Sequence, residues 1–188
     1  MGSYICWTFI GSFLTLYLTD CVKLSDANIA FMGTIILGCR VFDGLSDIGM
    51  GILIEKTNSK LSKARPWFGI SVISLCLVFV LLFSVPKMSE SGTVVYVSIL
   101  YFLFTVVIYT ANKLAFSALL PRISNDVVDQ TAVSSVDTLF TGVGTLAVAV
   151  VIPMLNAFGG AMLNSSWLKL VLPLAVLALV VQALCFLY

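Results

Sequence analysis

The sequence predicts an all-α membrane protein consisting of one six-helix transmembrane bundle. Hydrophobic residues make up 60% of the 188 residues and charged residues only 10%, with a mean hydropathy of +1.11. A soluble domain carries about 25% charged residues. The apolar residues fall into six runs separated by polar, proline or glycine positions. These runs are far longer than the roughly ten alternating residues of a barrel strand, which excludes a transmembrane β-barrel.

Polar and proline residues set the ends of the first three predicted helices. The first helix covers about 3–19 and stops where the sequence becomes polar. The second covers about 27–55, which is longer than the roughly 20 residues that a bilayer requires, so we expect it to tilt or protrude. The third covers about 67–85, between Pro66 and Pro86.

The remaining apolar runs predict three more helices and complete a single domain over residues 1–188. The fourth helix covers about 93–119 and is stopped by Pro121. The fifth and sixth cover about 130–153 and 166–188.

Basic residues are unevenly distributed between the loops, which predicts the orientation of the bundle. One group lies in the second-to-third and fourth-to-fifth connections, namely Lys56, Lys60, Lys63, Arg65 and Arg122. The opposite side has only Lys23, Lys87 and Lys169. By the positive-inside rule we expect both termini to be cytoplasmic in a multi-pass protein of the plasma membrane, the cell inner membrane. The N-terminus shows no signal-peptide pattern.

The composition also excludes several functions. The chain has no His, which removes His metal sites and His general bases. The five cysteines form no CxxC motif, and we interpret them as small hydrophobic residues. A net charge of +1 disfavours a nucleic-acid partner. We expect no cofactor.

Three charged residues lie in the interior of the second predicted helix. Asp43 and Asp47 are four residues apart and therefore share one helix face, with Arg40 one turn earlier. Each such side chain costs roughly 3 kcal/mol at a bilayer centre. Arg40 can pair with Asp43, which leaves Asp47 without a counter-ion. Intramembrane acids usually line a water-filled or ion path, so this pattern favours ion or proton handling over a purely structural ion pair.

Lys113 and Asp137 add two charges on the fourth and fifth predicted helices. Counted from the cytoplasmic ends, both lie at roughly the depth of Asp47, about 12–14 Å at about 1.5 Å per residue. A shared polar cavity would require this arrangement. The alternative is that Lys113 reaches the interface and Asp137 faces solvent. The five intramembrane charges sum to one negative charge, so we hypothesise that one Na⁺, Li⁺ or H⁺ completes the cluster.

Glycines are frequent in the second and fifth predicted helices. They are Gly33, Gly38, Gly44, Gly49 and Gly51 in the former, and Gly142 and Gly144 in the latter. We interpret them as sites of close helix packing. The alternative is a helix pair that slides or bends during transport.

Two motifs carry a family resemblance. The segment Phe42-Asp43-Gly44-Leu45-Ser46-Asp47 and the loop ending Lys63-Ala64-Arg65-Pro66-Trp67 resemble the melibiose-permease-like family of glycoside–pentoside–hexuronide:cation symporters, within the major facilitator superfamily. The family pattern there reads R-x-W-D-A-x-N-D-P-x-M-G, followed by a basic loop ending in K-x-R/K-P-W. Tyr17-Leu18-Thr19-Asp20 and Tyr109-Thr110 match further parts of it. The resemblance runs over nearly the whole chain.

The resemblance implies a site for the coupling cation, Na⁺ or H⁺. The family's two cation-coordinating acids correspond to Asp43 and Asp47, and its assisting threonine corresponds to Thr110. Ser46 stands where the family has Asn, which keeps an oxygen ligand on a shorter side chain. Ile48 stands where the family has Pro, so the local helix geometry can differ.

The resemblance also implies a solute cavity with altered charges. The family's sugar-binding positions correspond to Tyr4, Lys113, Ser117 and Asp137, and we place Arg40 in the same cavity. The family has an acid at the position of Lys113 and an arginine at that of Asp137. We interpret the exchange as an ion pair of reversed polarity between the fourth and fifth helices. It makes galactoside recognition doubtful but keeps a polar cavity.

The matched part of the family is the first of two six-helix bundles. Transporters of this superfamily bind the solute between two bundles, so we expect one half-bundle that needs a second half or a homodimer. The leading hypothesis is the N-terminal half of a cation-coupled transporter for a sugar or related solute. The alternative is a non-transporting assembly or regulatory module, or a fragment, derived from such a half. An enzyme is disfavoured because paired catalytic acids would have to come from different helices.

Overall fold

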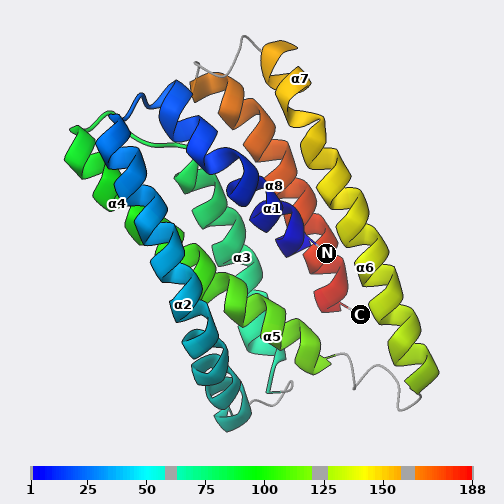
Figure 1. The fold of residues 1–188 in the computed structure, drawn as a ribbon. Helices are drawn as coiled ribbons and strands as arrows, with labels where there is room; N and C mark the ends of the chain where they lie inside the picture. Colours follow the sequence, from blue (N-terminus) through cyan, green and yellow to red (C-terminus); the bar gives the residue numbers. More distant parts are fainter. Residues whose placement is uncertain (1, 58–62, 120–126, 158–163, 188) are drawn as a thin grey trace.

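The chain, seen in a computed structural model, forms a bundle of long helices that run side by side (Figure 1). The structure describes residues 2–57, 63–119, 127–157 and 164–187. Lys60, Pro121 and Arg122, which were used to predict helix ends and orientation, lie outside these ranges. Within these ranges the regular secondary structure is entirely helical, which confirms the all-α class.

The helices follow the expected segments closely, and two π-helical turns interrupt them. The elements are α1 (Gly2–Leu16), η1 (Tyr17–Cys21), α2 (Asp26–Lys56), α3 (Arg65–Leu82), α4 (Glu90–Phe102), η2 (Leu103–Tyr109), α5 (Thr110–Leu119), α6 (Val127–Ala149), α7 (Val151–Ala157) and α8 (Asn164–Leu187). Elements α4, η2 and α5 form one continuous helix.

Four helical stretches among the described residues are long and apolar enough to cross a membrane. They are α2, α3, the continuous helix Glu90–Leu119 and residues Ser165–Leu184 of α8. By itself α1 is 15 residues long, shorter than the roughly 20 residues that a bilayer requires. Helix α6 carries the acids Asp129 and Asp137. The predicted number of six transmembrane helices therefore stays a prediction.

The helix ends differ from the expected ones at several places, including the start of α6 at Val127 rather than 130, and three of the differences have identifiable reasons. Helix α3 ends at Leu82 rather than 85, because Pro86 disfavours helical backbone in the residue before it. Helix α4 begins at Glu90 rather than 93, because the Ser89 hydroxyl caps it and accepts from the Gly92 amide at 3.3 Å. The segment 130–153 divides after Ala149, which is four residues before a proline and is therefore where that ring disturbs the helix.

Helices α1, α3 and α8 form the centre of the bundle, and α2 and α6 lie on opposite outer sides (Figure 1). The centre is filled by aromatic rings, with Phe9 of α1 and Phe83 of the segment after α3 packed around Trp167 of α8. Trp167 is fully buried. These rings hold one face of α1 against α3 and α8. Tyr4 and Trp7 lie on a different face of α1.

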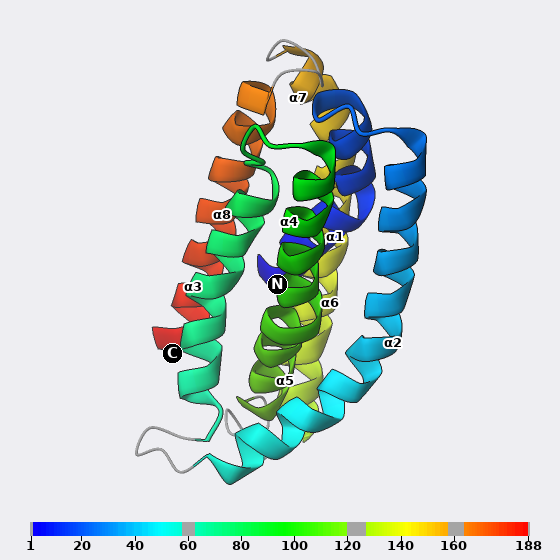
Figure 2. The same ribbon diagram turned by 90° about the vertical axis from the view of Figure 1, so that its left-hand side faces the viewer.

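Helix α2 is peripheral and packs against the continuous helix α4–η2–α5 (Figure 2). Hydrogen bonds hold it near both ends. Glu90 accepts from Ser25 at 3.0 Å and from Asn28 at 2.9 Å, and Trp67 Nε1 donates to the Thr57 hydroxyl at 2.8 Å. The outward side of α2 is apolar and exposed, as lipid or a second bundle requires.

The glycines of α2 and α6 differ in their surroundings. A Cβ atom placed on any of the five α2 glycines would meet no described atom within 4 Å. Close packing inside this bundle was therefore the wrong interpretation for α2, whose glycine positions lie on open sides of the helix. It is right for α6 at Gly144, where a Cβ would lie 2.9 Å from Cγ1 of Ile5 on α1.

This contrast predicts opposite effects for two neighbouring substitutions. Gly142→Ala is expected to raise the free energy of unfolding by up to about 1 kcal/mol, because alanine favours helix. Gly144→Ala is expected to lower it by about 1 kcal/mol, because the methyl group overpacks against Ile5. Thermal unfolding in detergent measures both. Adding Ile5→Ala to Gly144→Ala should restore stability, and two equally stable glycine variants would contradict the account.

Candidate cation and solute site

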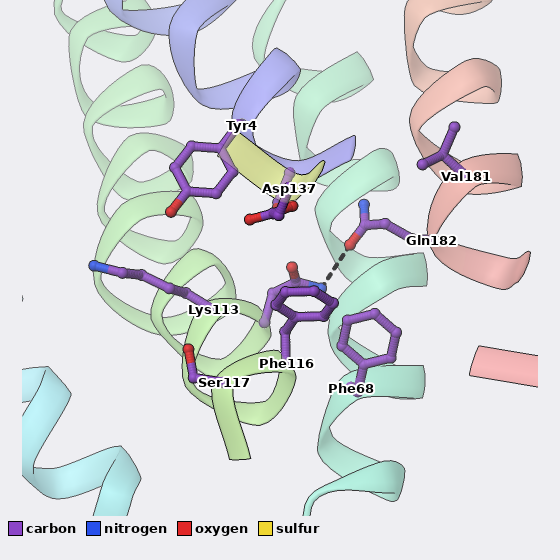
Figure 3. A pocket seen from close by; sticks show the side chains of 10 residues that line it. Tyr4, Phe68, Lys113, Phe116, Ser117, Asp137, Val181 and Gln182 are labelled. Carbon is purple, nitrogen blue, oxygen red and sulfur yellow. Dashed lines mark hydrogen bonds between the residues drawn. The ribbon is translucent and has the colours of Figure 1, made fainter. Parts of the chain in front are cut away.

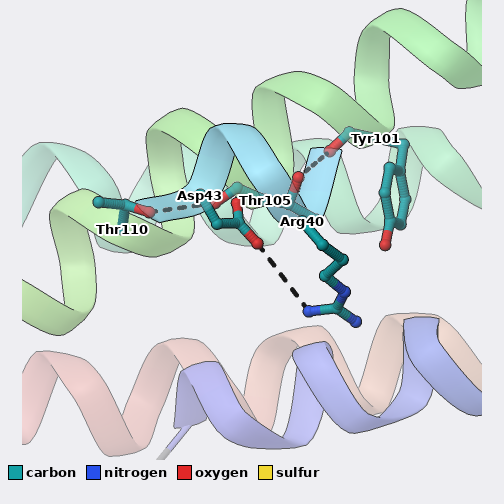
Figure 4. A network of polar contacts seen from close by, with 5 residues as sticks. All are labelled: Arg40, Asp43, Tyr101, Thr105 and Thr110. Atoms are coloured by element: carbon teal, nitrogen blue, oxygen red, sulfur yellow. Dashed lines mark hydrogen bonds and ion pairs between the residues drawn. The ribbon is translucent and has the colours of Figure 1, made fainter. Parts of the chain in front are cut away.

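Asp43 is the acid of α2 that the structure places against the neighbouring helix. Its Oδ2 lies 3.9 Å from Arg40 Nη1, at the outer limit of an ion pair (Figure 4). Its Oδ1 is buried and has no hydrogen-bond partner among the described residues. A buried acceptor left in this state costs about 1–3 kcal/mol. The charges of Arg40, Asp47 and Lys113 also act on this carboxylate.

The π-helical turn η2 faces this part of α2 and supplies oxygen atoms to it. The Ser46 hydroxyl donates to the Val106 carbonyl. Thr105 donates to the Tyr101 carbonyl at 3.0 Å, and the buried Thr110 donates to the Thr105 carbonyl at 3.3 Å (Figure 4). Each hydroxyl uses its proton in these bonds, which leaves oxygen lone pairs able to bind a cation. Single π turns inside α-helices are frequent at functional sites.

A stack of aromatic side chains extends from Arg40 across the bundle. The Arg40 guanidinium lies 4.3 Å from the ring centre of Trp7 on α1. The Trp7 ring stacks on Tyr109 of η2 at 4.3 Å, and Tyr4 meets the same tyrosine edge-on at 6.2 Å. This cation–π and aromatic stack joins the Asp43 region to Tyr4.

Tyr4 lines a polar pocket of about 100 Å³ at the other end of the stack (Figure 3). Five helices contribute to the walls, through Ser3, Tyr4, Phe68, Asn112, Lys113, Phe116, Ser117, Asp137, Val181 and Gln182. The Lys113 amine points away from the Asp137 carboxylate in Figure 3. The two charges share a pocket, and their direct ion pair stays a prediction.

The predicted site residues thus fall into two connected groups. Asp43 and Ser46 lie on α2, which packs against the continuous helix that carries η2 and Thr110, and the partly buried Asp47 is one turn further along α2. Tyr4, Lys113, Ser117 and Asp137 line the pocket. Arg40 lies between Asp43 and Trp7 and is not among the residues that line this pocket, and its place in the solute cavity stays a prediction.

Three residues of the site were missed from the sequence. Trp7 is three residues after Tyr4 and therefore on the same helix face, which could have indicated its position. Asn112 was overlooked beside the charge of Lys113. Gln182 is a single amide inside the apolar run of α8, the pattern that marks a functional polar residue in a membrane helix.

No group of three or more His, Cys, Asp or Glu side chains able to hold a metal ion occurs in the described part of the chain. The arrangement on α2 and η2 offers two carboxylates together with hydroxyl oxygens. Oxygen ligands of this kind suit hard cations, which bind carboxylate and carbonyl oxygen.

Comparison with known proteins gives one family over the whole chain. The family model described as MFS/sugar transport protein matches residues 1–188. The chain is 30% identical over 186 residues to the inner membrane symporter YicJ of Escherichia coli (strain K12), covering 98% of this chain and 40% of that protein.

Two further relatives are named for their solutes. The isoprimeverose transporter of Lactiplantibacillus pentosus is 26% identical over 185 residues, covering 97% of this chain and 38% of that protein. The sodium-dependent lysophosphatidylcholine symporter 1-A of Danio rerio is 28% identical over 160 residues, covering 81% of this chain and 29% of that protein. The chain spans about two fifths or less of the length of these curated relatives.

Proposed function

Because the chain belongs to the MFS/sugar transport protein family, we propose that it is the N-terminal half of a secondary transporter that couples a sugar or related organic solute to Na⁺ or H⁺. The family resemblance seen in the sequence is confirmed by the family match and by relatives that include an inner membrane symporter and an isoprimeverose transporter. The cation, the solute and the assembly of the whole transporter are our proposals.

The buried Oδ1 atom of Asp43 is the observation that carries the cation site. A carboxylate in this position needs either a proton or a cation to offset its desolvation. A cation between Asp43 and Asp47 would find additional oxygen ligands in Thr110 and Ser46. Arg40 neutralises only part of the charge, because its contact with Asp43 is long and its own side chain is 47% exposed.

Coupling to the solute follows from the stack through Trp7. A cation on Asp43 competes with Arg40 for the carboxylate and leaves the guanidinium to its contact with Trp7. Trp7 and Tyr109 carry that change toward Tyr4 at the pocket. Cation binding thereby raises the affinity of the pocket for the solute. Because the two binding free energies are linked, solute binding raises the affinity for the cation by the same factor.

The pocket and the outer faces of the bundle suit one side of a larger transporter. Solute sites in this superfamily lie between two bundles that rock against each other. We propose that a second six-helix bundle or a second copy of the chain faces the pocket. Both termini are then cytoplasmic, in keeping with the basic loops.

Vesicle uptake with a cation gradient tests this function. The chain is expressed in its native genetic context, so that any second half encoded with it is also produced, and the assembly is sized on a native gel. We expect a particle with two bundles that accumulates a radiolabelled glycoside when Na⁺ or H⁺ is higher outside. A stable single bundle with no cation-dependent uptake would instead indicate the non-transporting module.

A further inference from the structure

A second cavity, which the proposed transport site does not use, lies between α2, α3 and the continuous helix α4–η2–α5. Its volume is about 450 Å³, against about 100 Å³ for the solute pocket. This is within the roughly 300–1,000 Å³ that is usual for ligand sites. The lining is almost entirely apolar and includes Met50, Trp67, Ser74, Leu77, Val107 and Ala111. We call this cavity the lateral groove.

The lateral groove and the solute pocket lie on different sides of the bundle. Ala111 lines the groove and Lys113 lines the pocket. Two residues along an α-helix turn through about 200°, so these residues are on opposite sides of α5. Ile70 and Ile73 of α3 also line the groove, and each is 64% exposed. A second bundle that covers the pocket therefore leaves the groove facing the lipid.

The groove is elongated and is closed at one end. Helices α2 and α3 lie on either side of α4–η2–α5, which forms the floor (Figure 2). The end of α2 and the start of α3 are held together where Trp67 Nε1 donates to the Thr57 hydroxyl at 2.8 Å. Trp67 also lines the groove. Tryptophan is enriched at the membrane–water interface, so this end is where the headgroup of a lipid would lie.

Basic residues surround the end of the groove that carries Trp67. Lys56 is the last residue of α2, Arg65 is the first residue of α3, and Lys63 lies shortly before it. The side chains of Lys56 and Lys63 are exposed. In the sequence 55–67, four basic residues stand against the single acid Glu55. Such clusters beside a membrane helix attract anionic lipid headgroups, with a gain in affinity of up to about fivefold per basic side chain.

The headgroup, rather than the acyl chain, must select the lipid. Acyl chains are as apolar as the lining of the groove, so burying one there gives little preference over the surrounding bilayer. Phosphatidylcholine carries a positive choline beside its phosphate and is neutral overall. Phosphatidylglycerol lacks that positive group and is anionic, which matches the excess of basic residues at this end.

We infer that the lateral groove binds an acyl chain of an anionic phospholipid from the surrounding bilayer, and that Lys56, Lys63 and Arg65 hold its headgroup beside Trp67. The acyl chain lies along η2 between α2 and α3. This inference concerns lipid binding alone and needs neither the coupling cation nor the solute. Its failure therefore leaves the proposed transport function untouched.

Quenching of Trp67 fluorescence by brominated lipids tests the inference. The protein is produced in its native genetic context, purified in detergent, and titrated with brominated phosphatidylglycerol or brominated phosphatidylcholine. The same titrations of Trp67→Phe are subtracted to isolate the Trp67 signal, because bromine quenches only at close range. We expect half-maximal quenching at an about tenfold lower concentration of phosphatidylglycerol than of phosphatidylcholine.

Two variants with matched controls separate the headgroup from the acyl chain. Lys56→Gln/Lys63→Gln should reduce the preference for phosphatidylglycerol to about twofold, whereas Lys87→Gln, an exposed lysine between α3 and α4, should keep it. Ser74→Phe fills the groove and should weaken binding of both lipids about tenfold. Val95→Phe adds a ring at an exposed position of α4 outside the groove and should not weaken it.

Four results would overturn the inference. They are equal quenching of the wild type by both lipids, full preference in Lys56→Gln/Lys63→Gln, wild-type binding by a folded Ser74→Phe, and no quenching of Trp67 at all. The last result would show that a second bundle covers the groove. If Ser74→Phe does not fold, the lysine variants decide, because they change only exposed side chains.

Discussion

Replacing Asp43 by asparagine is expected to weaken binding of the coupling cation about 100-fold or more, equivalent to about 2.7 kcal/mol. The substitution keeps the size of the side chain and removes the negative charge that lies beside Asp47 and Arg40. All the proposed ligands come from this chain, so the purified chain in lipid nanodiscs is sufficient for the measurement. Binding of radioactive Na⁺ at constant ionic strength gives the affinity, and pH-dependent solute binding gives the corresponding value for a proton.

A matched control lies on the same helix. Asp26 is the first residue of α2, is exposed, and is far along the helix from the candidate site. Asp26→Asn should therefore leave cation affinity within about twofold, since single exposed charges contribute little. If Asp43→Asn and Asp26→Asn both bind the cation as the wild type does, the site on α2 is wrong.

Reversing one charge of the pocket is expected to be the second most damaging change. Lys113→Asp would place two acids in the pocket, and Asp137→Arg would place two bases there. Each leaves an unbalanced charge in the pocket, and we expect a roughly tenfold lower yield of folded protein together with loss of solute binding. The double variant Lys113→Asp/Asp137→Arg restores the balance and should recover most of the yield. Size-exclusion chromatography in detergent measures it.

Lys87 provides the control for this pair. It is an exposed lysine between α3 and α4, away from the pocket-lining residues. Lys87→Asp makes the same change of charge outside the pocket and should cost little. Equal defects in both single variants and the double variant would contradict a charge balance between Lys113 and Asp137.

Much of the arrangement of the candidate site could be predicted because intramembrane charges are costly and therefore informative. The spacing of Asp43 and Asp47 placed them on one side of α2, and the helix boundaries mostly follow proline and polar positions. The depth argument also brought Lys113 and Asp137 together, and both line one pocket. These features depend on local sequence and on the cost of burying charge, which a single sequence records.

Other features depend on contacts between helices that no local pattern reports. The π turn η2 brings the Val106 carbonyl to Ser46, although its sequence is an ordinary apolar run. The position of Arg40 over Trp7 depends on where α1 and α2 lie relative to each other in the bundle. The α2 glycines resembled packing positions, yet only the structure shows that their sides of the helix are open within this bundle.

The most direct test of the cation site is the position of a heavy monovalent ion. Thallium(I) replaces alkali cations at oxygen sites and scatters anomalously, so a crystal of the chain soaked in a thallium salt locates the ion. We predict one anomalous peak in contact with Asp43 and Asp47 on α2, next to Thr110, that disappears when Na⁺ is in excess. No peak there, with both carboxylates directed at lipid or sealed against Arg40 and Lys113, would contradict the account.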